Sequence, residues 1–459
     1  MSVALEKLRE RVDGRRVAVI GIGVSNTPVI RQLASLGAKV TARDRSLHPA
    51  DDAVLDQFRA QGVELRLGDG YLDELDEDMV LRTPGLRFDH PALEAARARG
   101  AEVTSEMELF FELCPCPIFG VTGSDGKTTT TTLICEMLAR QGFTCHKGGN
   151  IGTPLLPVLD DIMPSDMAVV ELSSFQLQDM RRSPDVAVIT NLSPNHLDYH
   201  KDFEEYIQAK ANIFRWQTPN DRLVYNAGNA ATALLTADAP SHRVAFGWNR
   251  CGDGVYCRGD RIVYADESGE REVLSVDEIR LPGRHNVENY MAAVAAVMDY
   301  VDPEQIRAVA REFGGVEHRI EWVRDLDGVA YYNDSIASSP TRAQAGLCSF
   351  SEPIVLIAGG YDKHLDYTEF GDLVAQRVKA LILLGATSEK IRRAVLASRH
   401  YSPALSITEV SSMEEAVKAA REQAARGDVV LLSPASASFD LYRNFMERGR
   451  HFKDLVNAL

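Results

Sequence analysis

The sequence predicts an α/β protein with three domains, each built around a mainly parallel sheet. Its 459 residues are enough for about two to four domains of ordinary size. Three blocks of the chain alternate short apolar runs with helical stretches, which is the pattern of strand–helix–strand units. The content of 45% hydrophobic and 25% charged residues is close to that of globular proteins. We therefore expect folded domains at residues 1–105, 106–315 and 316–459.

Charge and composition exclude several classes of protein. The chain has 50 basic and 66 acidic residues, and a net charge of −16 argues against general binding of nucleic acid or anionic membranes. Its seven cysteines show no Cys-x-x-Cys pairing, so reduced structural thiols are expected. The N-terminus lacks the apolar core of a signal peptide, and the longest apolar runs, such as 291–298, are too short to span a membrane. We expect a cytoplasmic protein with no nucleic-acid or membrane partner.

The first block has the opening of a Rossmann-like domain. A strand at residues 16–20 leads into a Gly-x-Gly turn at 21–26 and a helix through Leu36, and a second strand at 39–42 ends at Asp44 and Arg45. An acidic residue about twenty positions after such a turn often holds a ribose. Asn26 stands where a third glycine would be, so a nicotinamide or flavin dinucleotide is disfavoured. We favour another nucleotide or a nucleotide sugar, with a purely structural turn as the alternative.

The second block contains a phosphate-binding loop. Residues 117–132 read as an apolar strand, a glycine-bracketed turn, a lysine and a helix that opens on threonines. Backbone amides of such a turn and the dipole of the helix favour an anion, Lys127 adds a positive charge, and the Thr128 hydroxyl can hold Mg²⁺. Gly120 lies six residues before Gly126 instead of five, so this is a variant loop. A structural corner with a chance lysine is the alternative.

The helix after this loop should run from Thr128 to Gln141 and stop at Gly142. A second backbone-exposing turn follows at 148–152, and strands at 167–171 and 186–191 end in polar residues. Ligands of parallel sheets bind at the carboxyl ends of the strands, so Glu171 is placed for a metal ligand or a general base. An exposed glutamate at a strand end is the alternative.

The second block contains two further sets of candidate functional residues. His196 and Asp198 could serve Mg²⁺ or phosphates, although a lone histidine is more often structural. Lys210 lies in a helix at 203–216 with apolar neighbours, which predicts a partly buried face, and a buried lysine must lose its charge, find a partner or be modified. Residues 221–279 are strand-rich without a catalytic pattern, and a helix is expected at 287–300.

The third block is another parallel α/β pattern. Strands are expected at 329–333, 354–360, 380–385 and 429–433, with helices between them. Polar side chains again follow the strands, at the carboxyl ends where a substrate pocket is expected. These side chains are Asp334, Lys363, His364, Ser433 and Ser438.

Together these motifs resemble the Mur ligases, ATP-dependent amide-forming enzymes of peptidoglycan precursor synthesis. The matching segments run in family order over nearly the whole chain, at 122–128, 148–152, 171–177, 191–198, 283–289, 318–319, 333–335 and 432–440. The Glu-Leu-Ser-Ser-Phe-Gln-Leu run at 171–177 and the Ser-Pro-Ala-x-Ala-Ser run at 433–438 are similar to the glutamate-adding branch of the family. The resemblance implies a Rossmann-like N-terminal domain, a central P-loop ATPase domain with a small β-rich part, and a Rossmann-like C-terminal domain.

The resemblance also implies roles for individual residues. ATP would be held by Gly123, Ser124, Asp125, Gly126, Lys127, Thr128, Thr129, Asn286, Asn289, Arg319 and Asp334. A pair of Mg²⁺ ions would be held by Thr128, Glu171, His196 and Lys210, with Lys210 carbamylated as in the family, and Lys127, His196 and Lys210 would be the catalytic groups. Substrates would be bound by Gly21, Gly23, Val24, Ser25, Asp44, Arg45, Thr83, Pro84, Gly85, Asn150, Ser173, Lys363, Ser438 and Phe445.

The function that follows is the ATP-dependent addition of D-glutamate to UDP-N-acetylmuramoyl-L-alanine through an acyl phosphate, by a monomeric enzyme. Many relatives have lysine after Asn-Asp-Ser, where this chain has Ile336, so addition of L-glutamate or another amino acid stays open. A P-loop kinase, a nucleotide-cofactor dehydrogenase and a non-catalytic nucleotide-binding protein are the alternatives from other classes.

Overall fold

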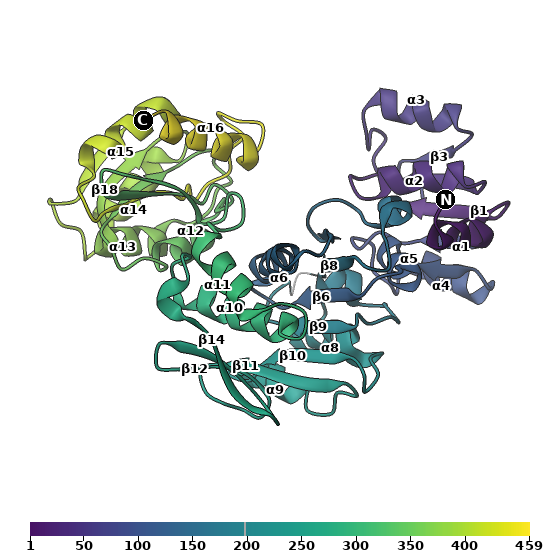
Figure 1. Ribbon diagram of the computed structural model, residues 1–459. Coiled ribbons are helices and arrows are strands. Elements are labelled where there is room, and N and C mark those ends of the chain that lie inside the picture. The colour runs from purple at the N-terminus through teal and green to yellow at the C-terminus, as the bar shows by residue number, and fades with distance from the viewer. Residues whose placement is uncertain (197–198) are drawn as a thin grey trace. The chain divides into compact units, whose positions relative to one another are not determined.

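The computed structural model describes residues 1–196 and 199–459. It divides into two compact units, one of residues 1–276 with 288–309 and one of residues 277–287 with 310–459. The first unit holds a five-stranded and a nine-stranded sheet, and the second unit holds a six-stranded sheet (Figure 1). These sheets, rich in parallel pairs and flanked by helices, confirm the predicted α/β fold class. No helix in the described part of the chain is long and apolar enough to cross a membrane.

The N-terminal sheet is a parallel sheet of the order β3-β2-β1-β4-β5, as the Rossmann-like pattern predicts. Val17 and Val19 of β1 face a core shared with α1, α2, α3 and α5, whereas Ala18 and Ile20 face α4. Helices therefore cover both faces, so its strands are apolar runs. The elements are α1 (Val3–Val12), β1 (Arg16–Ile20), α2 (Asn26–Ser35), β2 (Lys39–Asp44), α3 (Asp52–Ala60), β3 (Glu64–Leu67), β4 (Met79–Leu81), α4 (Pro91–Ala98), β5 (Glu102–Thr104) and α5 (Glu106–Leu113).

The central sheet places β6 between β8 and β9, in the order β14-β13-β12-β11-β10-β9-β6-β8-β7. One hydrophobic cluster runs from the N-terminal sheet through α5 to buried residues of β8, β9 and α8. The elements are β6 (Ile118–Thr122), α6 (Lys127–Gln141), β7 (Cys145–Gly149), a 3-10 helix (Leu156–Asp161), β8 (Met167–Glu171), α7 (Ser174–Leu177), β9 (Val186–Ile189), α8 (Phe203–Arg215), β10 (Arg222–Asn226), α9 (Ala230–Leu235) and β11 (His242–Gly247).

The predicted strand-rich region forms the far edge of this central sheet. Strands β12 (Gly254–Arg258), β13 (Arg261–Asp266) and β14 (Gly269–Ser275) pair antiparallel, and β12 joins β11 in parallel. Helices α10 (Arg284–Val297) and α11 (Pro303–Glu312) follow. The helix α10 begins three residues earlier than predicted, because Gly283 takes a left-handed φ of 98° and the polar residues after it form the first helical turn.

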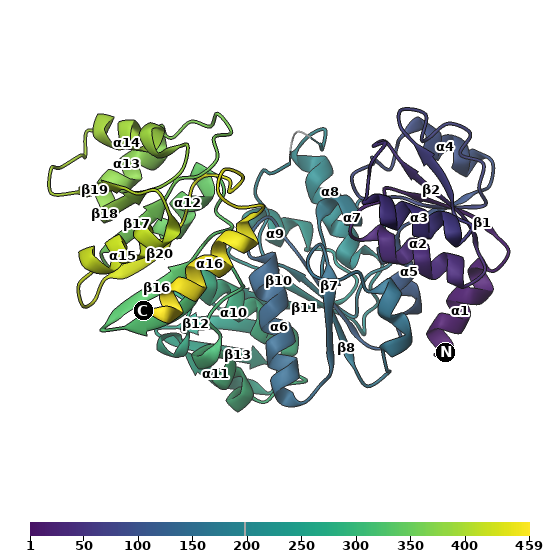
Figure 2. The same ribbon diagram turned by 90° about the horizontal axis from the view of Figure 1, so that it is seen from above.

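The C-terminal sheet has the order β15-β16-β20-β17-β18-β19, with only β15 antiparallel. Helices α12, α13 and α14 contribute to the core on one face, and α15 and α16 to the core on the other (Figure 2). The elements are β15 (Glu321–Leu326), β16 (Val329–Asn333), α12 (Pro340–Leu347), β17 (Ile354–Ala358), α13 (Thr368–Arg377), β18 (Val378–Leu383), α14 (Ser388–Ala397), β19 (Ser406–Glu409), α15 (Met413–Gln423), β20 (Val429–Leu432) and α16 (Phe445–Ala458).

A buried ion pair fixes the loop that joins β3 to β4. The Arg43 guanidinium, on β2, donates to Glu77 at 2.8 and 3.0 Å, and both side chains are almost fully buried. It also donates to the main-chain carbonyls of Tyr71, Asp73 and Glu74 at 2.9–3.0 Å. One arginine thus pairs with the buried Glu77 carboxylate and holds three main-chain carbonyls of the loop.

We expect Arg43→Met to destabilise the N-terminal domain by about 3–5 kcal/mol, because it leaves the Glu77 carboxylate buried and uncompensated. Hydrogen exchange of the β1 amides measures this loss in the full chain. Arg66→Met is the matched control, since Arg66 pairs with the exposed carboxylates of Glu64 and Glu74 and should cost less than about 1 kcal/mol. Equal exchange rates in the two variants would contradict the expectation.

Candidate active site

The phosphate loop connects α6 to β6, the strand that lies between β8 and β9 in the central sheet. Its two glycines have left-handed φ values, 147° at Gly123 and 81° at Gly126. A Cβ at Gly123 would lie 1.9 Å from Thr190 Oγ1, and one at Gly126 would lie 2.3 Å from Asn289 Oδ1. Both positions therefore require glycine. The first-turn amides of α6 begin directly after the loop, and amides there have no partner within a helix.

Neighbouring strands hold this loop in shape. Thr190 and Asn191 follow β9, and the Asn191 carbonyl accepts from Ser124 N at 2.9 Å while its Oδ1 accepts from Asp125 N at 2.9 Å. The Ser124 hydroxyl contacts the Tyr206 hydroxyl at 2.9 Å. The loop is thus braced before any ligand arrives, which is the preorganisation an anion site needs.

The Lys127 side chain lies over the loop that precedes it. Its Nζ donates to the carbonyls of Gly123 and Ser124 at 3.0 and 2.9 Å. The Lys127 ammonium group therefore lies at the loop, where it would contact a bound phosphate. The predicted neighbour Thr129 is buried in the first turn of α6.

Three predicted residues from three elements form a cluster at the edge of the sheet. The Thr128 hydroxyl donates to Glu171 Oε2 at 2.7 Å, and Asn150 Nδ2 donates to Glu171 Oε1 at 2.8 Å. Glu171 ends β8 and is only 2% exposed, so the alternative of an exposed strand-end glutamate is wrong. A hydroxyl and a carboxylate beside a phosphate loop are oxygen donors of the kind that Mg²⁺ prefers, so this cluster fits that ion.

Lys210 is buried beneath the phosphate loop, deeper than its helical pattern predicts. Its Nζ donates to Gly123 O at 2.8 Å and to Thr122 Oγ1 at 3.0 Å, and it lies 4.8 Å from the centre of the Tyr206 ring. Burial, reinforced by the charge of Lys127, lowers the pKa of Lys210 well below its usual value. The uncharged amine is thereby favoured.

The remaining predicted metal ligand lies in an exposed loop. His196 has a left-handed φ of 54°, and its ring packs against the Phe175 ring at 5.0 Å. That His196 and Lys210 hold one metal ion together stays a prediction. Asp198 lies outside the described residues. Ser173 caps the helix α7 that carries Phe175, in a capping box with Gln176.

The N-terminal glycine turn is held in shape by the side chains of Asp44, at the end of β2, and Asn26. Asp44 Oδ2 accepts from Ile22 N at 2.7 Å, and Asn26 Nδ2 donates to the carbonyls of Ile20 and Gly21 at 3.0 Å. Gly21 approaches the Thr83 side chain so closely that a Cβ would lie 3.1 Å from it, which brings two predicted turns together. The other residues predicted around these turns are exposed or half-buried, namely Gly23, Val24, Ser25, Arg45, Pro84 and Gly85.

In the C-terminal sheet, the strand-end residues Asp334 and Ser433 meet as predicted. The Ser433 hydroxyl donates to Asp334 Oδ2 at 2.8 Å, and Ile320 N donates to Oδ1 at 3.3 Å. Burial raises the pKa of Asp334 to about 7, opposed by Ser433 and by the charge of Arg319. Arg319 itself is exposed, in a turn with left-handed φ values at His318 and Ile320.

Three of the predicted substrate-binding residues, Lys363, Ser438 and Phe445, lie on loops of the same sheet and at the start of α16. Ser438 is buried, Lys363 is exposed with its Nζ 5.5 Å from the Phe439 ring, and Phe445 begins α16 and accepts at its carbonyl from Ser335 Oγ at 2.7 Å. The loops after β17 and β20 are joined by the bond from Tyr361 N to Ala437 O at 2.9 Å. The predicted ATP residues Asn286 and Asn289 both belong to α10. Asn286 Nδ2 donates to Pro282 O at 2.7 Å, and Asn289 Oδ1 accepts from Thr130 Oγ1 at 3.4 Å.

Sequence reasoning missed the buried arginine that holds the chain around Ser335, Ser436 and Ala437. Arg448 donates to the hydroxyl and carbonyl of Ser335 at 3.0 and 2.8 Å and to the carbonyls of Ser436 and Ala437 at 3.1 Å. Burial lowers its pKa to about 10. It lies in the first turn of α16 with several charged neighbours, so the pattern gives no signal of its burial.

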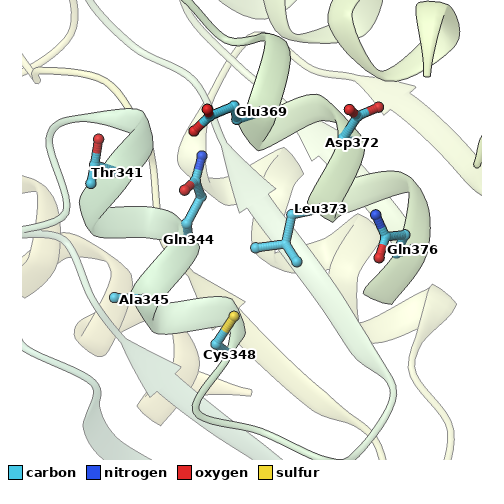
Figure 3. A pocket seen from close by; sticks show the side chains of 8 residues that line it. All are labelled: Thr341, Gln344, Ala345, Cys348, Glu369, Asp372, Leu373 and Gln376. Carbon is cyan, nitrogen blue, oxygen red and sulfur yellow. The ribbon is translucent and has the colours of Figure 1, made fainter. Parts of the chain in front are cut away.

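An open groove of about 450 Å³ lies elsewhere in this unit, between α12 and α13 (Figure 3). None of the predicted site residues lines it; its lining is Thr341, Gln344, Ala345, Cys348, Glu369, Asp372, Leu373 and Gln376. Among the described residues, no group of three or more His, Cys, Asp or Glu side chains is arranged to hold a metal.

Family models match three successive parts of the chain. They are the Mur ligase MurD-like N-terminal domain at residues 15–105, the Mur ligase middle domain at 121–297 and the Mur ligase glutamate ligase domain at 318–436. The UDP-N-acetylmuramoylalanine–D-glutamate ligase of Acetivibrio thermocellus is 50% identical over 464 residues, covering 100% of both chains. The chain belongs to the Mur ligase family. The resemblance predicted from the motifs is confirmed.

Other Mur ligases are similar over the same length. The ligase of the same name from Ruminiclostridium cellulolyticum is 48% identical, with 100% of both chains covered. Among solved structures, a UDP-N-acetylmuramate-alanine ligase from Thermotoga maritima matches with a TM-score of 0.56 at 19% identity, covering 97% of this chain and 99% of that one. A UDP-N-acetylmuramoyl-L-alanyl-D-glutamate–2,6-diaminopimelate ligase matches with a TM-score of 0.57 at 18% identity, covering 98% and 94%. At these identities the structures show the shared fold.

We expect Gly123→Ala to weaken binding of a fluorescent ATP analogue at least about tenfold, or about 1.4 kcal/mol. The added Cβ would collide with Thr190, so the loop must leave its braced shape. Gly142→Ala is the matched control, because Gly142 ends the same helix with a left-handed φ of 111° and open space around its Cβ position. Its affinity for the analogue should stay within about twofold. The expectation fails if both variants bind the analogue equally well.

Proposed function

We propose that the chain is an ATP-dependent ligase that joins D-glutamate to the alanyl carboxyl of UDP-N-acetylmuramoyl-L-alanine. The observation that carries this proposal is the full-length likeness, at up to 50% identity, to ligases named for that reaction, in a chain that keeps the phosphate loop and the Thr128–Glu171 pair. The enzyme would act in peptidoglycan precursor synthesis, as a monomer in the cytoplasm. The seven cysteines are free thiols, as is usual in reducing compartments.

In this proposal the reaction has two steps. The γ-phosphate of ATP passes to the alanyl carboxylate, which gives an acyl phosphate and ADP. The amine of glutamate then attacks the acyl carbon, the amide bond forms, a proton leaves the nitrogen and phosphate departs. Two anions must meet in the first step, so the chain has to supply positive charge and fixed hydrogen-bond donors at that point.

We propose the following division of roles. The loop from Gly123 to Thr129, with Lys127 above it, would hold the triphosphate. Thr128 and Glu171 would hold one Mg²⁺, and His196 with Lys210 a second, and the ions would neutralise charge on the phosphates. Asn286, Asn289, Arg319 and Asp334 would complete the ATP site. Residues 1–105, 106–315 and 316–459 would be the nucleotide-sugar, ATP and amino-acid domains.

Carbamylation of Lys210 agrees with its surroundings. An uncharged amine is the form that reacts with CO₂, and burial favours that form here. The reaction makes one N–C bond and releases one proton, so a buried amine becomes an anionic oxygen ligand. That product would suit a cation, whereas an ammonium in the same place would repel one.

The substrate sites follow the same division of the chain. Gly21, Gly23, Val24, Ser25, Asp44, Arg45, Thr83, Pro84 and Gly85 would bind the nucleotide, and Asn150 and Ser173 the sugar and alanyl end. Lys363, Ser438 and Phe445 would bind glutamate. Ile336 follows Ser335 where many relatives have lysine, so the charge on the glutamate carboxylate would be met by Lys363.

The test is incubation with ATP, Mg²⁺ and UDP-N-acetylmuramoyl-L-alanine against a panel of amino acids in both configurations. We expect phosphate release and an amide product with D-glutamate, and neither when the nucleotide sugar or the amino acid is left out. Product with L-glutamate alone would replace the proposal with the L-specific alternative. Phosphate transfer without an amino acid would indicate a kinase, and no release in any mixture would overturn the ligase.

A further inference from the structure

The turn at 83–85, between β4 and α4, is fastened to the central domain by the arginine on its N-terminal side. The Arg82 side chain is buried and forms an ion pair with Asp179. Its Nη2 donates to the Phe175 carbonyl at 3.2 Å, and its Nη1 donates to the turn's own carbonyls at Thr83 and Leu86, at 3.2 and 2.7 Å. One guanidinium therefore hydrogen-bonds both to the turn and to the helix α7.

A second arginine, Arg87, fastens the other side of the turn. Its Nη1 donates to the Tyr199 carbonyl and its Nη2 to Glu205 Oε1, each at 2.8 Å. Asp89 accepts two further bonds at 2.9 and 3.0 Å, and these bonds with Asp89 and Glu205 raise the pKa of Arg87. The Tyr199 hydroxyl returns a bond to the Pro84 carbonyl at 3.3 Å. The contact is thus reciprocal between turn and loop.

The two carbonyls that the arginines hold belong to the residues around His196. The Phe175 ring lies edge-on to the His196 ring at 5.0 Å and to the Tyr199 ring at 4.4 Å. It also stacks on the ring of His200 at 5.6 Å, with 3° between the planes. A shift of either carbonyl would carry this aromatic cluster, and His196 with it, away from its place.

Simple adhesion between two domains would not require this arrangement. Arginine offers five donors in a rigid fork, and here each fork bonds both main-chain carbonyl and carboxylate oxygens. Main-chain bonds fix backbone position more tightly than contacts between flexible side-chain tips. The partners also lie on the turn and the loop themselves, whereas adhesion could be provided anywhere along the domain boundary.

We propose that Arg82 and Arg87 form a clamp that sets the nucleotide-sugar turn in register with the loop that carries His196. The clamp rests on the proposed function, because that function assigns the turn to the nucleotide sugar and His196 to the phosphoryl-transfer centre. Both arginines are positioning residues. They hold the two halves of the site at the separation at which the alanyl carboxylate can reach ATP, and small errors in such a separation cost rate steeply.

The test uses Arg87→Ala in the full chain, since Arg87 is only partly buried and its loss leaves the Arg82 ion pair in place. We expect kcat to fall between about tenfold and a hundredfold and KM for the nucleotide sugar to rise, while KM for ATP and for glutamate stay within about twofold. Arg66→Ala, which removes an arginine paired with exposed carboxylates of the same domain, should leave all of these constants unchanged.

A double-mutant cycle with Glu205→Ala separates the clamp from general destabilisation. If Arg87 and Glu205 act through one contact, the double variant should be about as slow as the slower single variant, whereas Arg66→Ala should combine additively with Glu205→Ala. Calorimetric binding of UDP-N-acetylmuramoyl-L-alanine should be weakened in Arg87→Ala and in Glu205→Ala but not in Arg66→Ala, and this readout needs no turnover. Turnover by the unaltered chain tests the proposed function separately. A lowered melting temperature with unchanged kcat, KM and binding would overturn the clamp.

Discussion

Two lysines donate to the same main-chain carbonyl of the phosphate loop, that of Gly123, and much of the site depends on this shared contact. Lys127 reaches the Gly123 carbonyl from above at 3.0 Å, and Lys210 reaches it from the buried side at 2.8 Å. Two ammonium groups so close together repel each other, and the buried one also loses its hydration. Lys127 is half-buried and offers its positive charge to a phosphate, whereas burial and the charge of Lys127 lower the pKa of Lys210.

The topology of the central sheet makes this convergence possible. Strand β6 delivers the loop between β8, which ends in Glu171, and β9, which leads into Thr190 and Asn191. Each neighbour contributes one kind of support: β8 supplies the carboxylate that holds the Thr128 hydroxyl, and the chain after β9 supplies the carbonyl and amide that hold the loop's backbone. Helix α8 then closes the underside with Tyr206 and Lys210.

The sequence was sufficient to predict the fold class and the meeting of strand-end groups, because parallel strands bring their carboxyl ends to one edge. The Asp334–Ser433 pair is an example. It underestimated the burial of Lys210, since helical periodicity gives the inward face but not what covers it. The arginines at 82, 87 and 448 were missed altogether, because an arginine usually indicates a solvent-exposed position and several of their partners, such as Phe175, Tyr199 and Ser335, lie far away in the chain. Residue roles and exact domain boundaries stay predictions.

The most direct test of this account asks whether Lys210 is a neutral amine that takes up CO₂. Carbon NMR of the protein with ¹³C-labelled bicarbonate should show a carbamate signal that is absent in Lys210→Met. The signal should persist in Lys201→Met, which removes a lysine whose side chain is 71% exposed. Absence of any carbamate signal in the unaltered chain, or a signal that survives Lys210→Met, would contradict the account.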